Sequence, residues 1–492
     1  MFQISTIKNL TITSAIWLVI ESIFLLQAYA SPTNIDGLLS KARVIGTLPV
    51  IVQLKEPFVA EGNLSATEVL SQRQRVGISQ NSVINKLRAI GSRANNVKQF
   101  ERMIPYLALT VDITGLQALA ADLEVVSIHE DVPVPVSLAS SVPVMDIDEA
   151  HTDGFTGTGQ AVAILDTGVR TSHTWFQTRV ASEACFSSNV PSFGATSLCP
   201  GGLTSSTSPG SGSNCSNSIP GCDHGTHVAG IALGDNTATD GAAPSADLIA
   251  IQVFSRFDDS GSTNTCASVG LSSPCVLSFT SDQMSALIRV NNLSSSLTIA
   301  SVNMSLGGGN FVGTCDFDPR KSIIDTLRSN GIATVIAAGN SSLTNGMGAP
   351  ACISSSISVC STTDGDLFSS FTNVSASTDV CAVGSDILSS VSTSNNATGA
   401  KSGTSMSTPF VAGVIALLKQ SECTTISQVE SALETTGILF TDHRTGVPHT
   451  KPRIDADNAV MFCQSGPEPE PVDDSLCFPI KTQSGNVAVI CL

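Results

Sequence analysis

The sequence predicts an α/β protein built on a parallel sheet and preceded by a small α+β unit. From about residue 145 onward, short apolar runs alternate with segments of helical periodicity, which is the order that a parallel sheet requires. Residues 31–140 hold a different, cysteine-free pattern of the βαββαβ type. A chain of 492 residues is long enough for both units.

The elements of the first unit follow from the spacing of its apolar residues. Valine, leucine and isoleucine recur at helical intervals over 66–90, which predicts a long helix. A shorter helix is expected over 114–121, with Thr114 as its N-cap. Short apolar runs predict three strands, over 49–54, 104–111 and 125–128. The proline-containing segment 131–136 then leaves the unit as an extended chain.

In the second unit, apolar runs of strand length are followed by longer segments of helical character. The predicted strands cover 161–165, 247–253, 299–304 and 332–337, and the predicted helices cover 224–232, 281–291, 319–329 and 404–419. Two stretches rich in serine, glycine and threonine, 187–221 and 255–279, contain cysteine pairs. We expect these stretches to form surface loops that disulfides hold in place.

The N-terminus has the features of an export signal. Lys8 precedes an apolar stretch over 15–26, and a small-x-small sequence ends at Ala30. This order is typical of a signal peptide over 1–30 and predicts a secreted protein. Because Glu21 interrupts the apolar stretch, we expect no permanent membrane helix.

The C-terminus and the cysteines also favour an extracellular protein. Residues 466–472 have the composition of a proline–glutamate linker, and the short tail 473–492 contains Cys477 and Cys491, which could close a hairpin. All fourteen cysteines lie after residue 184, and this even number indicates disulfides and an oxidising compartment.

Charge excludes one class of partner. The net charge is −17, and the whole excess of acidic residues lies after residue 140. Nucleic-acid binding requires clustered lysine and arginine, so no nucleic-acid partner is expected. The simpler interpretation of this charge is solubility outside the cell. Some of the carboxylates could instead bind calcium, but no EF-hand spacing is present.

Three segments carry residues suited to chemistry. Asp166 follows the predicted strand 161–165, at the end where α/β sheets place functional groups. His224 opens a helix, and Ser405 opens a later one, where free N–H groups favour negative charge. His224 and His227 are three residues apart, but the glutamate of a zinc-protease motif is missing, so we predict no metal site.

The three residues together are more informative than each alone, since an isolated one is usually structural. A serine hydroxyl needs an adjacent base to become a nucleophile, and a histidine base needs a carboxylate to hold its tautomer. The chain order Asp166, His224, Ser405 is one known solution to this geometry. The residues are far apart in sequence, so only the fold can bring them together.

These segments resemble the signature segments of the subtilisin-like serine proteases, and the resemblance extends over about 145–440, including 303–307 and 337–340. It implies a parallel sheet with helices on both faces and a catalytic domain over 141–465. Residues 31–140 are similar to the family's inhibitory propeptide. We therefore expect a zymogen that cleaves itself within 130–145.

The resemblance also implies a role for each matching residue. Asp166, His224 and Ser405 match the catalytic triad, and Asn340 matches the side-chain donor of the oxyanion hole, with the Ser405 N–H as the second donor. His227 matches a structural position. The substrate-binding positions are Ser305, Leu306, Gly307, Ala337, Ala338 and Gly339. Together with 348–350, the small residues among them predict a roomy pocket and broad specificity for apolar or aromatic side chains.

Two departures from many relatives, Cys360 and Cys381, indicate a disulfide between them. Proximity in sequence predicts four more, Cys266–Cys275, Cys315–Cys352, Cys423–Cys463 and Cys477–Cys491. The remaining four, Cys185, Cys199, Cys215 and Cys222, are expected to pair among themselves, with a nested arrangement as one option.

The expected partners are protein or peptide substrates and the chain's own propeptide, with no nucleic acid and, after signal cleavage, no membrane. We expect a monomer that needs no cofactor for its chemistry, with structural calcium left open and no ligands assigned. A catalytically silent binding protein on the same scaffold is disfavoured because no triad residue is substituted. A dinucleotide site at Gly154, Gly157 and Gly159 is disfavoured because this run precedes a strand.

Overall fold

The computed structural model describes residues 35–134, 144–236, 240–260, 263–444 and 446–465, together with the backbone of 477–481 and 487–491. The predicted signal peptide and the linker 466–472 lie outside the described residues, as does most of the predicted cleavage region. No helix in the described part of the chain is long and apolar enough to cross a membrane.

The larger unit is built on a sheet of ten described strands in the order β21-β22-β18-β17-β15-β13-β6-β10-β7-β9. Every neighbouring pair from β22 to β7 is parallel, and an antiparallel strand closes each edge. The strands are β6 (Ala161–Asp166), β7 (Val180–Phe186), β9 (Ser205–Ser206), β10 (Asp247–Gln252), β13 (Ile299–Met304), β15 (Ala333–Ala337), β17 (Ile357–Thr362), β18 (Val380–Val383), β21 (Ile438–Thr441) and β22 (Thr450–Arg453). The predicted parallel sheet is confirmed.

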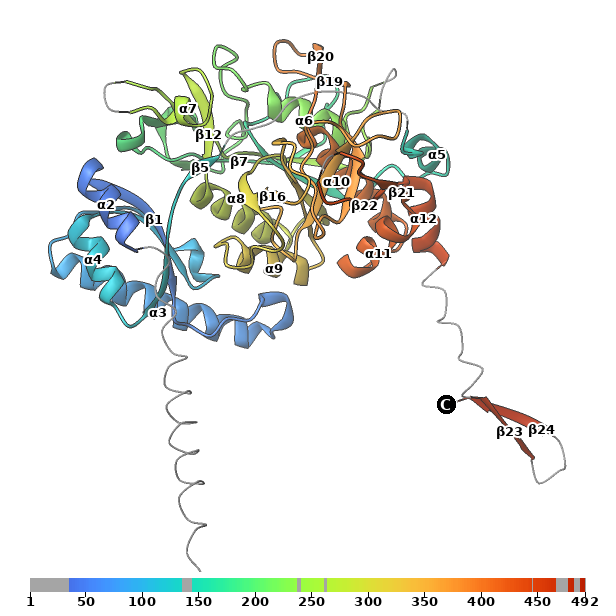
Figure 1. Ribbon diagram of the computed structural model, residues 1–492, viewed down its shortest axis with the longest axis horizontal. Helices are drawn as coiled ribbons and strands as arrows, with labels where there is room; N and C mark the ends of the chain where they lie inside the picture. Colours follow the sequence, from blue (N-terminus) through green and yellow to red (C-terminus); the bar gives the residue numbers. More distant parts are fainter. Residues whose placement is uncertain are drawn as a thin grey trace, which may run out of the picture.

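Helices cover both faces of this sheet, because successive side chains of each strand point to opposite faces. Val162 and Ile164 belong to one buried core, whereas Ala163 and Leu165 belong to the other. Residues of α5 (Ile147–Thr152), α6 (His224–Leu233), α10 (Thr404–Gln420), α11 (Ile426–Thr436) and α12 (Ala456–Ser465) fill the first core, and residues of α8 (Thr280–Leu293) and α9 (Lys321–Ser329) fill the second. Figure 1 shows α10 inside the larger unit, with α8 and α9 on the side of the N-terminal elements.

The N-terminal unit has the βαββαβ order of the predicted type, preceded by the helix α2, and its second strand, β2, was not among the predicted strands. Its elements are α2 (Ile35–Ile45), β1 (Thr47–Leu54), η1 (Glu61–Asn63), α3 (Ala66–Ala89), β2 (Ala94–Lys98), η2 (Phe100–Arg102), β3 (Tyr106–Asp112), α4 (Ile113–Ala121) and β4 (Val125–Glu130). The antiparallel sheet has the order β2-β3-β1-β4. The predicted cap of the short helix is wrong: the Asp112 carboxylate accepts the Gly115 N–H at 2.9 Å, so α4 starts one residue before Thr114.

The N-terminal unit packs against the larger one through apolar and extended contacts. Ile51, Met103 and Tyr106 share a buried core with side chains of α8 and α9. The chain then continues into β5 (Pro133–Val134), which pairs antiparallel with β12 (Cys275–Phe279). That pairing belongs to a four-stranded sheet, β5-β12-β11-β8, with β11 at Ser255–Phe257 and β8 at Ala195–Ser197.

Short elements complete the described structure. They are η3 (Pro191–Phe193), η4 (Pro200–Gly202), α7 (Thr265–Ser268), β14 (Gly308–Phe311), β16 (Met347–Ala349), β19 (Ile387–Ser390), β20 (Thr398–Lys401), β23 (Cys477–Lys481) and β24 (Val487–Cys491). The last two pair as the hairpin expected in the C-terminal tail.

Six disulfides occur among the described residues, and four of them are the predicted Cys266–Cys275, Cys315–Cys352, Cys360–Cys381 and Cys423–Cys463. The other two are Cys185–Cys199 and Cys215–Cys222, so the nested option is wrong. Each of these two disulfides closes its own short loop, with sequence separations of 14 and 7. Cys185 lies in β7, whereas the Cys215–Cys222 bridge lies just before α6, so the two pairs are at different places in the fold. The side chains of Cys477 and Cys491 lie outside the described residues.

Candidate active site

The candidate site lies along one edge of the parallel sheet. Asp166 is the last residue of β6, Ser305 follows β13, and Asn340 follows β15 by three residues. Because neighbouring parallel strands run in the same direction, their carboxyl ends meet at one edge, where open α/β sheets bind ligands. The topology therefore gathers three of the predicted site segments.

Asp166 and His224 form a buried pair at this edge. The Nδ1 atom of His224 lies 2.8 Å from Oδ1 and 3.0 Å from Oδ2 of Asp166, and both side chains are fully buried. The Thr167 N–H donates to Asp166 Oδ1 at 2.7 Å, which fixes the carboxylate. A carboxylate that accepts the Nδ1 proton holds the imidazole in the tautomer whose Nε2 atom can act as a base.

Ser405 lies in the first turn of α10, and that helix packs against α6. A Cβ atom on Gly413 of α10 would come within 2.5 Å of the Ala232 carbonyl oxygen in α6, so the two helices touch there with no side chain between them. Ser405 and His224 each precede this contact by roughly two helical turns. The geometry therefore sets both residues at the starts of two packed helices.

Ser405 is fully buried and exchanges hydrogen bonds with the residue that follows β13. Its Oγ atom donates to the Ser305 carbonyl at 3.0 Å, and the Ser305 hydroxyl donates to the Ser405 carbonyl at 2.8 Å. The N–H groups of the first helical turn have no acceptor within the helix, which leaves the Ser405 N–H suited to stabilise negative charge.

Asn340 is held by the residue that precedes Ser405. Its Oδ1 atom accepts the Thr404 N–H at 2.9 Å and the Thr404 hydroxyl at 3.0 Å. Because both bonds use the amide oxygen, the Nδ2 group faces away from Thr404 and is available as a donor. This amide and the Ser405 N–H are donors of the kind that an oxyanion hole needs.

The predicted substrate-binding segment Ser305, Leu306 and Gly307 lies between β13 and β14. Ser305 and Leu306 are buried, and Gly307 is half-buried. A Cβ atom on Gly307 would lie 2.8 Å from the Ala349 carbonyl oxygen. The strand that follows this segment, β14, also pairs with β16, so residues 347–349 support the segment on one side.

The second predicted segment turns sharply after β15. Ala337 and Ala338 are buried, and Gly339 has a φ of +104°, which favours glycine. Asn373 shapes this turn: its Nδ2 group donates to the Ala338 carbonyl at 3.0 Å, and its Oδ1 atom accepts the Ser341 N–H at 2.9 Å. Sequence reasoning missed Asn373, because a single asparagine in a loop carries no distinguishing pattern.

His227 has an ordinary structural environment, as the sequence predicts. Its Nε2 atom lies 3.0 Å from the carbonyl oxygens of Ile387 and Gly399. Burial, together with the nearby Lys401 and His224 side chains, lowers the pKa of His227 to about 3. The ring is therefore neutral at physiological pH and donates to backbone carbonyls.

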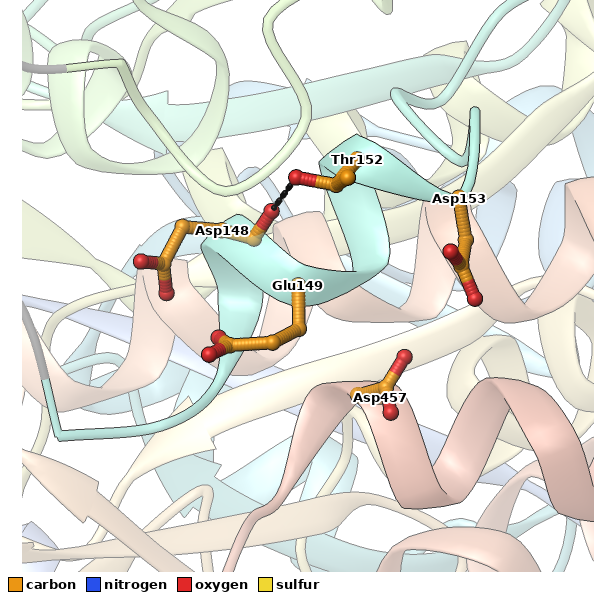
Figure 2. A pocket seen from close by; sticks show the side chains of 5 residues that line it. All are labelled: Asp148, Glu149, Thr152, Asp153 and Asp457. Atoms are coloured by element: carbon orange, nitrogen blue, oxygen red, sulfur yellow. Dashed lines mark hydrogen bonds between the residues drawn. The ribbon is translucent and has the colours of Figure 1, made fainter.

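No group of three or more histidine, cysteine, aspartate or glutamate side chains in the described residues is arranged to hold a metal ion. A cavity of about 270 Å³ lined mainly by acidic side chains lies between α5 and α12. Figure 2 shows Asp148, Glu149 and Asp153 on one side of it and Asp457 on the other. Burial and the neighbouring Asp153 and Asp455 raise the pKa of Asp457, as expected for crowded carboxylates.

The fold and the matched segments define a protease of the subtilisin type. The model of the Subtilase family matches residues 157–453, which is more than half of the chain. The chain therefore belongs to the Subtilase family, and it is a serine endopeptidase.

Proteases are among the known proteins that this chain resembles. Subtilisin NAT of Bacillus subtilis subsp. natto is 30% identical over 369 residues, which cover 73% of this chain and 82% of that protein. Thermitase of Thermoactinomyces vulgaris is 31% identical over 310 residues, which cover 62% and 90%. Among solved structures, a protease from Pseudoalteromonas arctica matches with a TM-score of 0.50 and 26% identity, over 66% of this chain and 95% of that chain.

Proposed function

We propose that Asp166, His224 and Ser405 form the catalytic triad of this endopeptidase, and that Asn340 and the Ser405 N–H bind the oxyanion. The observation that carries the proposal is the buried 2.8 Å contact between His224 Nδ1 and Asp166 Oδ1, at the sheet edge where Ser405 opens the adjacent helix. No other function is favoured by a specific observation.

The reaction follows from the protonation states that this geometry supports. For the reaction, the Ser405 hydroxyl gives up its bond to the Ser305 carbonyl and donates to His224 Nε2 instead. His224 takes the proton as Oγ attacks the peptide carbonyl carbon, and Asp166 stabilises the imidazolium. His224 then protonates the leaving amine, and water hydrolyses the acyl-enzyme through the same steps in reverse order.

Substrate binding in this proposal uses the backbone. An extended peptide adds as a strand along Ser305–Gly307, so hydrogen bonds to the main chain supply affinity without reading sequence. The side chain before the cleaved bond enters a pocket bounded by 337–339 and 348–350. These residues are small or apolar, which supports broad specificity for apolar and aromatic side chains.

Secretion and activation complete the proposal. Residues 1–30 direct export, and the unit over 31–140 inhibits the monomeric enzyme until cleavage within 130–145. Two contacts support this role of the N-terminal unit: the Lys98 Nζ atom lies 2.6 Å from the buried Asp282 carboxylate, and β5 adds to the edge of β12. Structural calcium remains an expectation with no assigned ligands.

The test compares the full-length wild type with Ser405→Ala, both expressed with the native signal sequence. Wild-type protein in the medium is expected to start within 130–145 by N-terminal sequencing and to digest casein. The Ser405→Ala protein is expected to keep its N-terminal unit and to be inactive. Processing or digestion by Ser405→Ala would refute the assignment, and an inactive, unprocessed wild type would favour the silent scaffold.

A further inference from the structure

A disulfide lies directly beside the Asp166–His224 pair. Cys215 and Cys222 are bonded across a sequence separation of only 7, and both are buried. Cys222 precedes His224 by two residues, so this end of the bridge sits at the start of α6. Nothing in the triad chemistry requires a disulfide at this place.

The other end of the bridge is tied to the backbone that carries Asp166. The Cys215 N–H donates to the Thr167 carbonyl at 3.1 Å, and the Val169 N–H donates to the Gly212 carbonyl at 2.9 Å. The segment 212–215 therefore runs along 167–169 through two main-chain hydrogen bonds. Since Thr167 directly follows Asp166, movement of Cys215 would be transmitted to the carboxylate.

A third contact closes the arrangement into a ring. The Gly225 N–H, next to His224, donates to the Thr167 hydroxyl at 3.0 Å. A Cβ atom on Gly168 would lie 2.2 Å from the Ser213 carbonyl oxygen, and one on Gly225 would lie 2.4 Å from the Gly168 carbonyl oxygen. The backbones on both sides of the pair are thus in direct contact, with no space for a side chain.

We propose that Thr167 and the Cys215–Cys222 disulfide are positioning residues, which hold His224 against Asp166 in the orientation that catalysis needs. This inference rests on the proposed function of the pair. The covalent link joins the backbone beside the carboxylate to the backbone beside the imidazole and restricts their relative motion. A displacement of about 1 Å at a catalytic group can cost on the order of 10²-fold in rate, so even modest loosening is measurable.

The chain offers a matched control. Cys266–Cys275 has a similar separation of 9 and is equally buried. It belongs to a core cluster with Phe257, Leu277 and Phe279 that contains none of the triad residues. Loss of either disulfide removes a crosslink of similar length, whereas only the loss of Cys215–Cys222 is expected to disturb the triad.

The experiment measures kcat, KM and the pH profile of kcat for two double variants on one peptide substrate, after processing by added wild-type enzyme. The variant C215A/C222A is expected to lose at least tenfold in kcat, with KM changed less than twofold and the pH profile altered. The control C266A/C275A is expected to keep kcat within twofold. Equal kcat values for both variants would overturn the positioning role.

A second pair of variants keeps the test decisive if a double variant fails to fold. Thr167→Val preserves shape but removes the acceptor of the Gly225 N–H, so kcat is expected to fall at least fivefold. Thr334→Val is the control, because the buried Thr334 hydroxyl has no hydrogen-bond partner in the described structure. Unchanged kcat in Thr167→Val would overturn the inference. A different result would refute the proposed function itself: wild-type enzyme that has no peptidase activity, or whose activity persists in Ser405→Ala.

Discussion

Two histidines three residues apart on α6 show how the environment of a side chain determines its role. The imidazole of His224 faces the Asp166 carboxylate, which stabilises a positive charge on the ring. The imidazole of His227 faces backbone carbonyls, with the Lys401 cation nearby, and its pKa is lowered to about 3 chiefly by burial. One ring is therefore suited to the base role that we propose for it, and the other to stay neutral.

The neutral state of His227 predicts a loss of stability in acid. Between pH 6.5 and about 3, the unfolded chain binds a proton that the folded protein excludes, so the free energy of unfolding decreases as the pH falls through this window. A single group contributes at most about 1.4 kcal/mol per pH unit. Urea unfolding of the inactive Ser405→Ala protein at pH 7, 5 and 4 measures this slope.

In the same background, His227→Gln is expected to make the free energy of unfolding depend less on pH below 6.5, because glutamine does not titrate but can still donate to a carbonyl. His443→Gln, at an exposed position, serves as the control. If the free energy of unfolding falls equally steeply below pH 6.5 with and without His227, other groups set the pH dependence.

Glycines of α6 and α10 allow close approach around the two helices that carry His224 and Ser405: Gly413 at the contact between the helices and Gly230 at the contact of α6 with β19. Gly413 of α10 lies against the Ala232 carbonyl, and a Cβ atom on Gly230 of α6 would come within 2.3 Å of the Ser389 hydroxyl. Close approach of helix backbones requires small residues at the point of contact. The positions of these helices therefore depend on glycines, which leave room for close backbone contact, as much as on apolar packing.

The substitution Gly413→Ala is expected to destabilise the protein by about 1–3 kcal/mol, since the added methyl group overlaps backbone atoms that cannot move aside cheaply. Chemical unfolding at pH 7 measures the change. Gly365→Ala is the control, because the nearest atom to its added Cβ is 3.8 Å away. Equal stability of the two variants would mean that the helix contact is looser than described.

The main segments of the site were predictable from sequence because each combines a polar residue with a strand end or a helix start. Asp166, His224 and Ser405 belong to this class. Asn373 was not predictable, because its function depends on a turn formed by residues distant in sequence. The pairing of Cys215 with Cys222 was left open because spacing alone does not fix disulfide connectivity.

At the level of elements, apolar periodicity predicted the long helices and the central strands, whose buried faces leave a clear pattern. Strand β2 (Ala94–Lys98) was missed because its side chains are mostly polar and exposed. Helix α2 (Ile35–Ile45) was also missed, since only Ala42 is fully buried in it. Their positions follow from packing against the rest of the N-terminal unit.

An ion pair between Lys98 and the buried Asp282 carboxylate joins the two units of the molecule. The Lys98 Nζ atom lies 2.6 Å from Asp282 Oδ1 and also donates to the hydroxyls of Ser188 and Ser281. The Asp131 carboxylate accepts the Ser281 N–H at 3.0 Å. The docking surface thus combines apolar contacts with an ion pair whose carboxylate is buried and whose ammonium group is partly exposed, and such a pair favours one orientation.

Lys98→Ala is expected to weaken inhibition by the cleaved N-terminal unit at least tenfold, because it leaves the Asp282 carboxylate buried and unpaired with a cation. The inhibition constant of the processed complex, measured from peptidase activity on dilution, tests this. Lys41→Ala is the control, since Lys41 pairs with Glu130 inside the N-terminal unit. A similar change in both variants would contradict a specific role for the Lys98–Asp282 contact.

The central claim is that Ser405 becomes a nucleophile because His224 and Asp166 activate it. Mass spectrometry after treatment with a fluorophosphonate, which reacts with activated serines, tests it most directly. We expect one adduct, on the peptide that contains Ser405, which is absent in Ser405→Ala and strongly reduced in His224→Ala. An adduct on a different serine, or full labelling of Ser405 without His224, would show that His224 and Asp166 do not activate Ser405.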